Sequence, residues 1–185
     1  MNISEKKEIE RNIFKKLRKK NSYLIEQNVE KNVKIYINSI MNKGIKNKYV
    51  GIYFPLKHEV DITSLRFEYF CALPKCEKNK RLVFCPWNGE KLTKDLEGIP
   101  APKSPNVLSY ESLSMLFVPC LSVDKNLIRL GYGGGYFDRL RKDKNWKKIP
   151  CIGILTSNCV SNSLLASEDW DIPLSGFITE KEIIV

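Results

Sequence analysis

Histidine is almost absent from this chain, and its cysteines are not spaced as metal ligands. His58 is the single histidine, and none of the six cysteines belongs to a CxxC pair. A structural zinc site needs clustered Cys and His ligands, so the sequence argues against one. Cys85, Cys120 and Cys151 lie inside apolar runs that are typical of strands. We therefore expect buried, reduced thiols and a reducing compartment.

Long apolar runs are also missing. The N-terminus has no apolar signal region, and the longest apolar run, near Met115 to Val123, is too short to cross a bilayer. No repeat or low-complexity stretch occurs, and hydrophobic residues make up 43% of the 185 residues, which argues against disorder. We predict one domain over residues 1–185, in the cytoplasm and without a membrane partner.

Acidic residues are outnumbered by basic ones. The 31 Lys and Arg exceed the 21 Asp and Glu, which gives a formal net charge of +10. This charge favours anionic partners such as nucleotides, polyanionic metabolites or nucleic acid. A solvated, lysine-rich surface would give the same composition, and composition alone does not separate the two. Because proteins that read bases rely on arginine, the excess of lysine argues against a nucleic-acid partner.

The spacing of apolar residues predicts a helix at the N-terminus. Residues 4–20 form an amphipathic pattern with Ser4 as the expected N-cap. Ile9, Ile13 and Leu17 recur every four residues and should form the apolar face.

Further helices alternate with short apolar runs. A second helix is expected at 29–41, ending near Gly44, and a third at 61–73, capped by Asp61 or Thr63. Apolar runs rich in β-forming residues predict strands at 49–55, 81–86, 113–121, 151–156 and 175–180. Continuous apolar strands that alternate with helices indicate an α/β fold, with a mostly parallel sheet and helices on both faces.

Ligand sites in such sheets lie beyond the carboxyl ends of the strands. Three loops therefore qualify as site loops. The first follows the strand at 49–55 and carries Lys57, His58 and Glu59, the second follows the strand at 81–86, and the third covers 119–135.

The third loop contains four glycines in five positions, within the segment RLGYGGGYFDRLRK. Glycine loses much conformational freedom on folding, so such a run indicates backbone that must approach something closely. Backbone N–H groups turned toward one point, beside the start of a helix, can bind an anion such as phosphate. Arg129 and Arg139 could clamp phosphate oxygens, and Asp138 could hold Mg²⁺ against them. The alternative is a tight turn lined with aromatic residues for core packing.

The segment RLGYGGGYFDR closely resembles the signature RLGxGxGYYDR of the 5-formyltetrahydrofolate cyclo-ligase family, also called methenyltetrahydrofolate synthetases. VPCLSVD resembles that family's VPGLAFD, and GIPAP resembles its I-P-x-P element. GIYFPLKHEVDITSL resembles its strand–loop–helix segment, and EDWDIPLSGFITE resembles its closing pattern H-D-x-x-x-D-x-I-[IV]-T-E. These stretches occur in the family's order and cover most of the chain.

The resemblance implies a ligase that uses ATP and Mg²⁺ to convert 5-formyltetrahydrofolate to 5,10-methenyltetrahydrofolate, with release of ADP and phosphate. ATP would phosphorylate the formyl oxygen, the folate's N10 would attack the activated carbon, and phosphate would leave as the ring closes. No nucleophile of the enzyme is needed, so the protein would position two substrates and neutralise the transferring phosphoryl group. The positive net charge suits ATP and a folate with a glutamate tail, and we expect a monomer.

Carried over by position, the resemblance implies roles for three groups of residues. ATP would be bound by Lys7, Arg11, Arg129, Gly131, Gly133, Gly134, Gly135, Tyr136 and Phe137. The folate would be bound by Phe54, Glu59, Trp87, Tyr132, Gly133, Gly134, Gly135 and Tyr136. Catalysis would involve Arg129, Tyr136 and Asp138, and Mg²⁺ would be held by Asp138 and Asp169. An exposed basic helix face, an ordinary loop glutamate and core aromatic residues are the corresponding alternatives.

The chain departs from the family pattern mainly on the folate side. Trp87 stands where the family has an arginine, Cys120 replaces a glycine, Asn158 a glutamine and Glu168 a histidine. We expect Trp87 to offer an aromatic face to the folate in place of the arginine. Two other functions remain open: an enzyme of this fold that acts on another anionic small molecule, and a basic RNA-binding module without catalysis.

Overall fold

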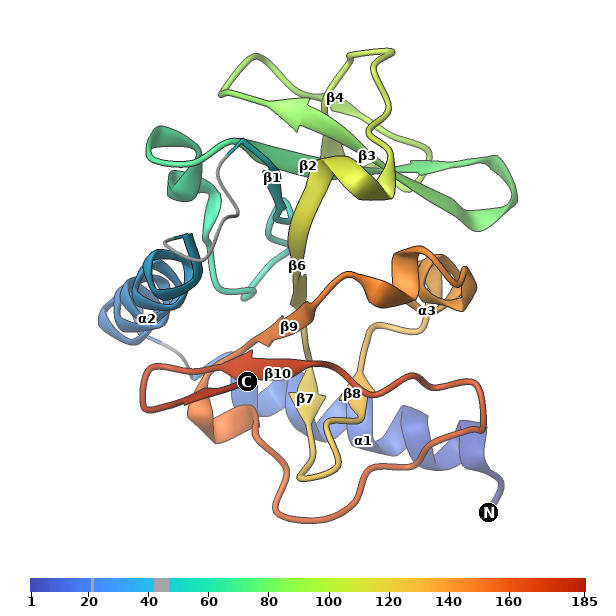
Figure 1. Cartoon of the computed structure of the whole chain (residues 1–185). Helices are drawn as coiled ribbons and strands as arrows, with labels where there is room; N and C mark the ends of the chain where they lie inside the picture. The colour runs from blue at the N-terminus through green and yellow to red at the C-terminus, as the bar shows by residue number, and fades with distance from the viewer. Residues whose placement is uncertain (21, 42–46) are drawn as a thin grey trace.

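The computed structural model describes residues 1–20, 22–41 and 47–185, and its centre is a seven-stranded sheet (Figure 1). The strands are β1 (Tyr49–Gly51), β2 (Cys71–Glu77), β3 (Arg81–Trp87), β6 (Leu113–Pro119), β9 (Cys151–Ile154), β10 (Gly176–Ile178) and β11 (Ile183–Ile184). Their order is β11–β10–β9–β6–β1–β2–β3, and the five inner strands run parallel. The edge strands β3 and β11 are antiparallel to their neighbours. The predicted mostly parallel α/β sheet is confirmed.

Helices and two small strand pairs complete the structure. The helices are α1 (Ile3–Arg18), α2 (Tyr23–Met41) and α3 (Tyr136–Lys142). The pairs are β4 (Thr93–Lys94) with β5 (Pro100–Ala101), and β7 (Ser122–Val123) with β8 (Arg129–Leu130). Short 3₁₀ turns occur at Thr63–Phe67, Lys78–Lys80, Tyr110–Ser112, Trp146–Lys148 and Ser157–Cys159. The expected helix end near Gly44 lies outside the described residues.

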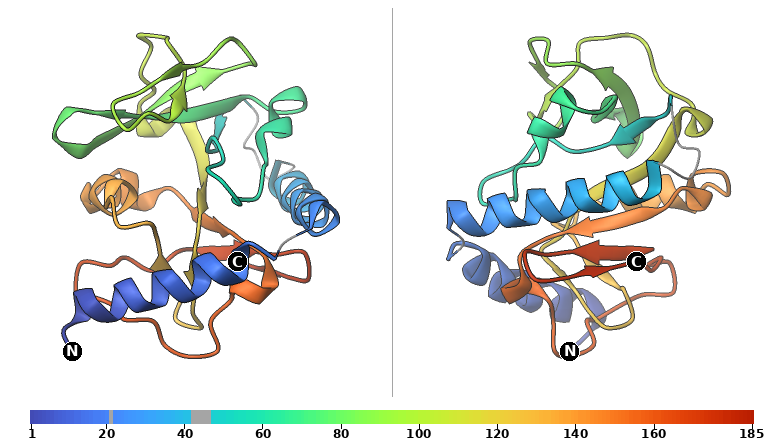
Figure 2. Two further views of the ribbon diagram at one scale, coloured as in Figure 1. Left: turned by 180° about the vertical axis from the view of Figure 1, so that it is seen from behind. Right: turned by 60° about the vertical axis from the view of Figure 1, so that its left-hand side comes forward.

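The helices cover both faces of the sheet, as predicted. Alternate residues of β6 enter different cores, because successive strand side chains point to opposite faces. Leu116 packs in the core that contains Phe14 of α1, whereas Met115 and Phe117 pack with residues of α2. Helices α2 and α3 accordingly lie on opposite sides of β6 in Figure 1, and the rear view in Figure 2 shows α1 crossing the β7–β8 pair.

Helix α1 differs from its predicted form at its cap and on its buried face. Asn2, not Ser4, is the N-cap, and its side chain and that of Glu5 form a capping box. Ile9 and Ile13 are 49% and 50% exposed, although the four-residue spacing predicted them on the buried face. Phe14 and Arg18 are buried instead, so an arginine contributes to the inner face of this helix.

The predicted helix at 61–73 is wrong. Only the 3₁₀ turn at Thr63–Phe67 forms, and the Asp61 carboxylate accepts hydrogen bonds from the backbone N and Oγ1 of Thr63, at 2.8 and 2.7 Å. Strand β2 then begins at Cys71 and pairs with β3 along its whole length. Pairing on both sides of β2 thus overrides the local helical pattern. Because β3 folds back in a hairpin, its carboxyl end lies at the opposite edge of the sheet from those of the parallel strands.

The six cysteines are buried free thiols, which confirms the burial predicted for Cys85, Cys120 and Cys151. Burial raises the pKa of the Cys120 thiol to about 12. Within the described ranges, no helix has both the length and the apolar character needed to cross a membrane.

Candidate functional site

A cavity of about 600 Å³ lies at the carboxyl edge of the parallel strands. Helix α1, the segment after β1, the turn between β4 and β5 and the loop between β8 and α3 all contribute to it. Its lining includes the expected residues Lys7, Arg11, Phe54, Glu59, Arg129, Gly131, Tyr132, Gly133, Gly134, Gly135, Tyr136, Phe137 and Asp138. The structure therefore brings together all the predicted site residues except Trp87 and Asp169.

The glycine loop is held by arginine side chains. Gly133 and Gly135 adopt left-handed backbone conformations, with φ of 101° and 68°, that favour glycine. A Cβ at Gly135 would lie 2.7 Å from a guanidinium nitrogen of Arg139. Arg139 also donates a 3.0 Å hydrogen bond to the Gly134 carbonyl, and Arg11 donates one of 3.0 Å to the Gly131 carbonyl. The run of glycines thus lets positive charge approach the backbone closely.

The aromatic residues of the loop divide between the cavity and the core. Tyr132 is 41% exposed, and the Arg18 guanidinium carbon lies 5.0 Å from its ring centroid. Tyr136 and Phe137 are partly buried against the core on the α1 side, yet both also line the cavity. The predicted alternative of a turn lined with aromatic residues for packing therefore describes only part of this segment.

Arg129 is the most enclosed cation of the cavity wall. Its side chain is 11% exposed, and it donates hydrogen bonds to the Pro119 carbonyl at 3.1 Å and to the Asp138 carboxylate at 3.3 Å. The guanidinium carbon also lies 5.4 Å from the centroid of the Phe137 ring. These contacts fix a permanent positive charge beside the glycine loop.

Glu59 places a buried carboxylate on the other side of the cavity. One oxygen accepts a 2.8 Å hydrogen bond from the backbone N of Leu56. The other, Oε1, is buried and has no hydrogen-bond partner among the described residues. Burial raises the pKa of this carboxyl group, and Arg18 and Arg129 oppose that shift. Its neighbour His58 is exposed.

The predicted basic pair of α1 reaches the cavity. Lys7 and Arg11 are four residues apart and so share one helical face. Lys7 forms an ion pair with Asp171, and Arg11 contacts the glycine loop as described above. The alternative of a freely solvated basic face does not hold for these two side chains.

Asp171, rather than Asp169, lines the cavity. Asp169 is exposed. Asp171 instead forms the ion pair with Lys7 and accepts a 2.8 Å hydrogen bond from the backbone N of Glu168. The sequence carried a signal for this difference. When the closing family pattern is counted back from Thr179 and Glu180, its first aspartate falls on Asp171 and its histidine on Trp170.

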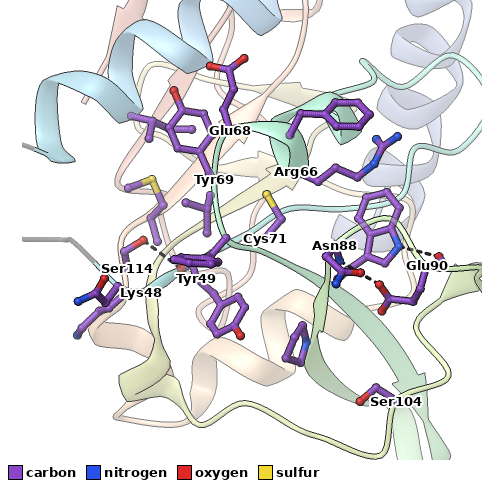
Figure 3. A pocket seen from close by; sticks show the side chains of 18 of the residues that line it. Lys48, Tyr49, Arg66, Glu68, Tyr69, Cys71, Asn88, Glu90, Ser104 and Ser114 are labelled. Carbon is purple, nitrogen blue, oxygen red and sulfur yellow. Dashed lines mark hydrogen bonds between the residues drawn. The ribbon is translucent and has the colours of Figure 1, made fainter.

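Trp87 lies at the other edge of the sheet, because β3 is antiparallel and pairs Trp87 with Cys71, the first residue of β2. Its indole N–H donates a 3.0 Å hydrogen bond to the Glu90 carbonyl, and the Arg66 guanidinium carbon lies 4.9 Å from its ring centroid. It lines a separate cavity of about 920 Å³, shown with Arg66 and Glu90 in Figure 3. The expected loop after residues 81–86 therefore does not join the glycine loop.

One polar residue of the cavity wall and one buried residue behind it were also not predicted. Glu97, in the turn between β4 and β5, accepts a hydrogen bond from the Tyr136 hydroxyl, and this bond raises the pKa of Tyr136. Arg18 is buried in α1 and lies 3.7 Å from Glu59 Oε1. The segment GIPAP, which resembles a family element, begins directly after Glu97 and was therefore a signal for that residue. Nothing in the lysine-rich sequence of α1 distinguished Arg18.

The remaining departures from the family pattern lie beside the cavity wall rather than in it. Cys120 is buried directly after β6. The Asn158 side chain donates a 3.3 Å hydrogen bond to the Leu17 carbonyl of α1. These two residues therefore support the elements that carry Arg18 and Arg129.

A mostly parallel α/β sheet with an arginine-lined cavity at its carboxyl edge is typical of enzymes that act on small molecules. Comparison with known proteins identifies the family. Residues 3–180 match the model of the 5-formyltetrahydrofolate cyclo-ligase family, and the chain belongs to this family of ligases. The resemblance drawn from the sequence is thereby confirmed.

Individual relatives agree with this assignment. The 5-formyltetrahydrofolate cyclo-ligase of Haemophilus influenzae is 29% identical over 161 residues, which cover 82% of this chain and 76% of the relative. The NMR structure of Aquifex aeolicus 5,10-methenyltetrahydrofolate synthetase is similar to the whole chain, with a TM-score of 0.77 and 27% identity, over 92% of that protein. The Mycoplasma pneumoniae synthetase shares the fold, with a TM-score of 0.69 and 21% identity, over 94% of this chain and 98% of that one.

Proposed function

We propose that this protein converts 5-formyltetrahydrofolate to 5,10-methenyltetrahydrofolate, with ATP and Mg²⁺ consumed as the family resemblance implies. The observation that carries the proposal is a single cavity with an arginine-held glycine loop on one side and, on the other, a buried carboxylate whose second oxygen has no hydrogen-bond partner among the described residues. The first suits a triphosphate, and the second suits a ligand with N–H donors. The buried free thiols fit a cytoplasmic enzyme, and we propose a monomer.

The phosphate side of the cavity is proposed to include Lys7, Arg11, Arg129 and the glycines. Guanidinium groups present forked donors that match phosphate oxygens, and the glycine backbone adds N–H groups without side-chain bulk. Arg129 is already fixed by Pro119 and Asp138. Its charge therefore needs little reorganisation when negative charge develops on the transferring phosphoryl group.

Two carboxylates fit a magnesium ion on this side. Asp138 and Asp171 line the same cavity as the glycine loop, and Mg²⁺ is commonly bound by one or two carboxylates together with substrate phosphates. A bound Mg²⁺ would supply charge neutralisation on the phosphate oxygens. In this structure Asp138 is paired with Arg129 and Asp171 with Lys7. Each carboxylate would therefore be shared between its basic partner and the Mg²⁺ ion.

The folate side is proposed to include Glu59, Phe54, Tyr132 and Tyr136. The free oxygen of Glu59 can accept hydrogen bonds from the N–H groups of the pterin, and the aromatic rings can cover its faces. Because Tyr132 and Tyr136 belong to the glycine loop, the pterin and the triphosphate would meet there.

The proposed reaction needs no side chain as nucleophile. The formyl oxygen attacks the γ-phosphoryl group and ADP leaves, after which the N10 lone pair forms the new C–N bond. The C–O bond of the phosphorylated intermediate then breaks, phosphate carries away the electron pair, and the proton of N10 passes to phosphate or solvent. The chain's contribution is to align the formyl oxygen with the phosphoryl group and to neutralise charge through Arg129.

A direct assay tests the proposal. Purified protein is mixed with 5-formyltetrahydrofolate, ATP and Mg²⁺, and the near-ultraviolet absorbance of the methenyl product is followed together with ADP release. We expect both signals to rise one for one and to disappear when ATP or Mg²⁺ is omitted. If ATP is hydrolysed without methenyl product, another anionic substrate is indicated; salt-sensitive RNA binding without turnover would indicate the RNA-binding function.

Trp87→Ala is expected to leave the KM values for folate and ATP within about twofold of wild type. The ring is 7% exposed at the far edge of the sheet, so its removal should instead lower the free energy of unfolding by about 3 kcal/mol. Steady-state kinetics and urea unfolding measure the two effects. Phe67→Ala, which removes a 76% exposed ring beside the same Arg66, is the matched control and should change neither. A selective rise in folate KM would return Trp87 to the folate site.

A further inference from the structure

Arg18 is the one arginine of α1 whose side chain is enclosed by the protein. The residue is 3% exposed, and it lies at the end of a helix whose other lysines and arginines are exposed or only partly buried. One guanidinium nitrogen donates to the Cys120 carbonyl at 3.3 Å, and the other donates to the Tyr132 hydroxyl. Arg18 therefore connects α1 to the end of β6 and to the glycine loop.

The third neighbour of Arg18 is Glu59. The closest guanidinium nitrogen lies 3.7 Å from Oε1, which is within range of an ion pair but too long for a hydrogen bond. The two side chains are 4% and 2% exposed, so their charges interact in a poorly screened environment. Arg18 thus offsets the charge of Glu59 while leaving Oε1 without a hydrogen-bond donor among the described residues.

We propose that Arg18 is a positioning residue for folate binding, which keeps Glu59 an ionised acceptor and holds the Tyr132 hydroxyl, without itself contacting the reacting atoms. The inference rests on the proposed function for its consequence in catalysis. Its physical part, the coupling of Arg18 to Glu59, stands on the contacts alone. A burial cost is inherent in this arrangement, because an isolated carboxylate in this position would favour its protonated form.

The groups that face Glu59 come from four elements. Arg18 approaches from α1, Arg129 from β8, Tyr53 from the segment after β1, and Cys120 from the end of β6. Burial raises the pKa of Glu59, and the backbone hydrogen bond from Leu56 and the two arginines lower it. Loss of Arg18 removes one of these two cations, so the pKa of Glu59 should rise further and protonation should compete with pterin binding.

Arg18→Met tests the proposal through the pH dependence of folate binding. We expect a folate KM raised by about tenfold at pH 7, which falls toward the wild-type value as the pH rises and Glu59 ionises. The KM for ATP should stay within about twofold. Combining Arg18→Met with Glu59→Gln should remove the pH dependence, since the amide does not titrate.

Two further variants separate this role from a structural one. Arg18→Lys keeps the charge but loses the second donor, so its folate KM should rise without a new pH dependence. Lys15→Met removes a cation whose nitrogen lies 5.5 Å from the same Tyr132 ring centroid, in a side chain that is itself exposed; it should behave as wild type. If Arg18→Met does not fold, Arg18→Gln with the same pH series takes its place.

An NMR titration tests the coupling independently of activity. Protein labelled with ¹³C at glutamate carboxyl groups is titrated, and the Glu59 signal is assigned by its loss in Glu59→Gln. Arg18→Met should move the Glu59 titration to higher pH, while Lys15→Met should not. An unchanged titration, or a folate KM with a wild-type pH profile, overturns the inference. A wild-type protein that makes no methenyl product overturns the proposed function instead, and the titration still decides the coupling.

Discussion

Asp138→Asn is expected to lower kcat by at least about a hundredfold while the protein remains folded. The Asp138 side chain is 37% exposed, so its charge can be removed without opening the core. It is paired with Arg129 at 3.3 Å and lines the cavity beside the glycine loop. The substitution therefore affects both the proposed Mg²⁺ site and the guanidinium group that would neutralise the phosphoryl group.

A magnesium titration distinguishes these two effects. If Asp138 holds the ion, the Mg²⁺ concentration that gives half-maximal rate should rise in Asp138→Asn, and excess Mg²⁺ should restore part of the activity. If it acts only through Arg129, kcat should fall with no change in the Mg²⁺ requirement. Asp169→Asn removes an exposed carboxylate outside the cavity and is the matched control, with kinetics expected within about twofold of wild type. Near-normal turnover in Asp138→Asn would contradict both roles.

The glycine loop was predictable because local sequence determines its character. Four glycines, two of them with positive φ, and the flanking arginines act over a few residues. Helical spacing also predicts that Lys7 and Arg11 share one face of α1. What spacing could not supply was the partner of each side chain, which depends on how α1 packs against β8 and the segment near Asp171.

The errors arose where pairing between distant segments decided the structure. Strand β2 carries a local pattern that also suits a helix, and its pairing with β1 and β3 is visible only in the folded sheet. The loop after residues 81–86 was predicted as a site loop and the resemblance implied that Trp87 contacts the folate, but the antiparallel pairing of β3 with β2 puts Trp87 at the other edge of the sheet. Arg18 shows the same limit, because a buried arginine and a solvated one look identical within a lysine-rich helix.

Glu59→Gln is expected to raise the folate KM by roughly ten- to a hundredfold, with little change in the KM for ATP. Hydrogen bonds to charged groups contribute about 1.5–3 kcal/mol, and the amide presents a single acceptor where the carboxylate presents two. The amide oxygen can still accept the 2.8 Å hydrogen bond from Leu56, so the loop should keep its shape. Steady-state kinetics with each substrate varied in turn measure the effect. Glu90→Gln, on the other edge of the sheet, is the control, and an equal loss for both substrates would contradict a folate-specific role.

The same substitution should change how the stability of the protein depends on pH. Because burial raises the pKa of Glu59 above its value in the unfolded chain, the native state holds more protons over the interval between those two values. Wild-type stability should therefore fall as the pH rises through this interval, and Glu59→Gln should lack that fall. Urea unfolding at pH 5 and pH 8 tests this: the stability of the variant relative to wild type should be higher at pH 8 than at pH 5. A carboxylate that costs stability while one of its oxygens lacks a hydrogen-bond donor, and that gains this donor from the ligand, behaves as expected of a binding residue rather than a structural one.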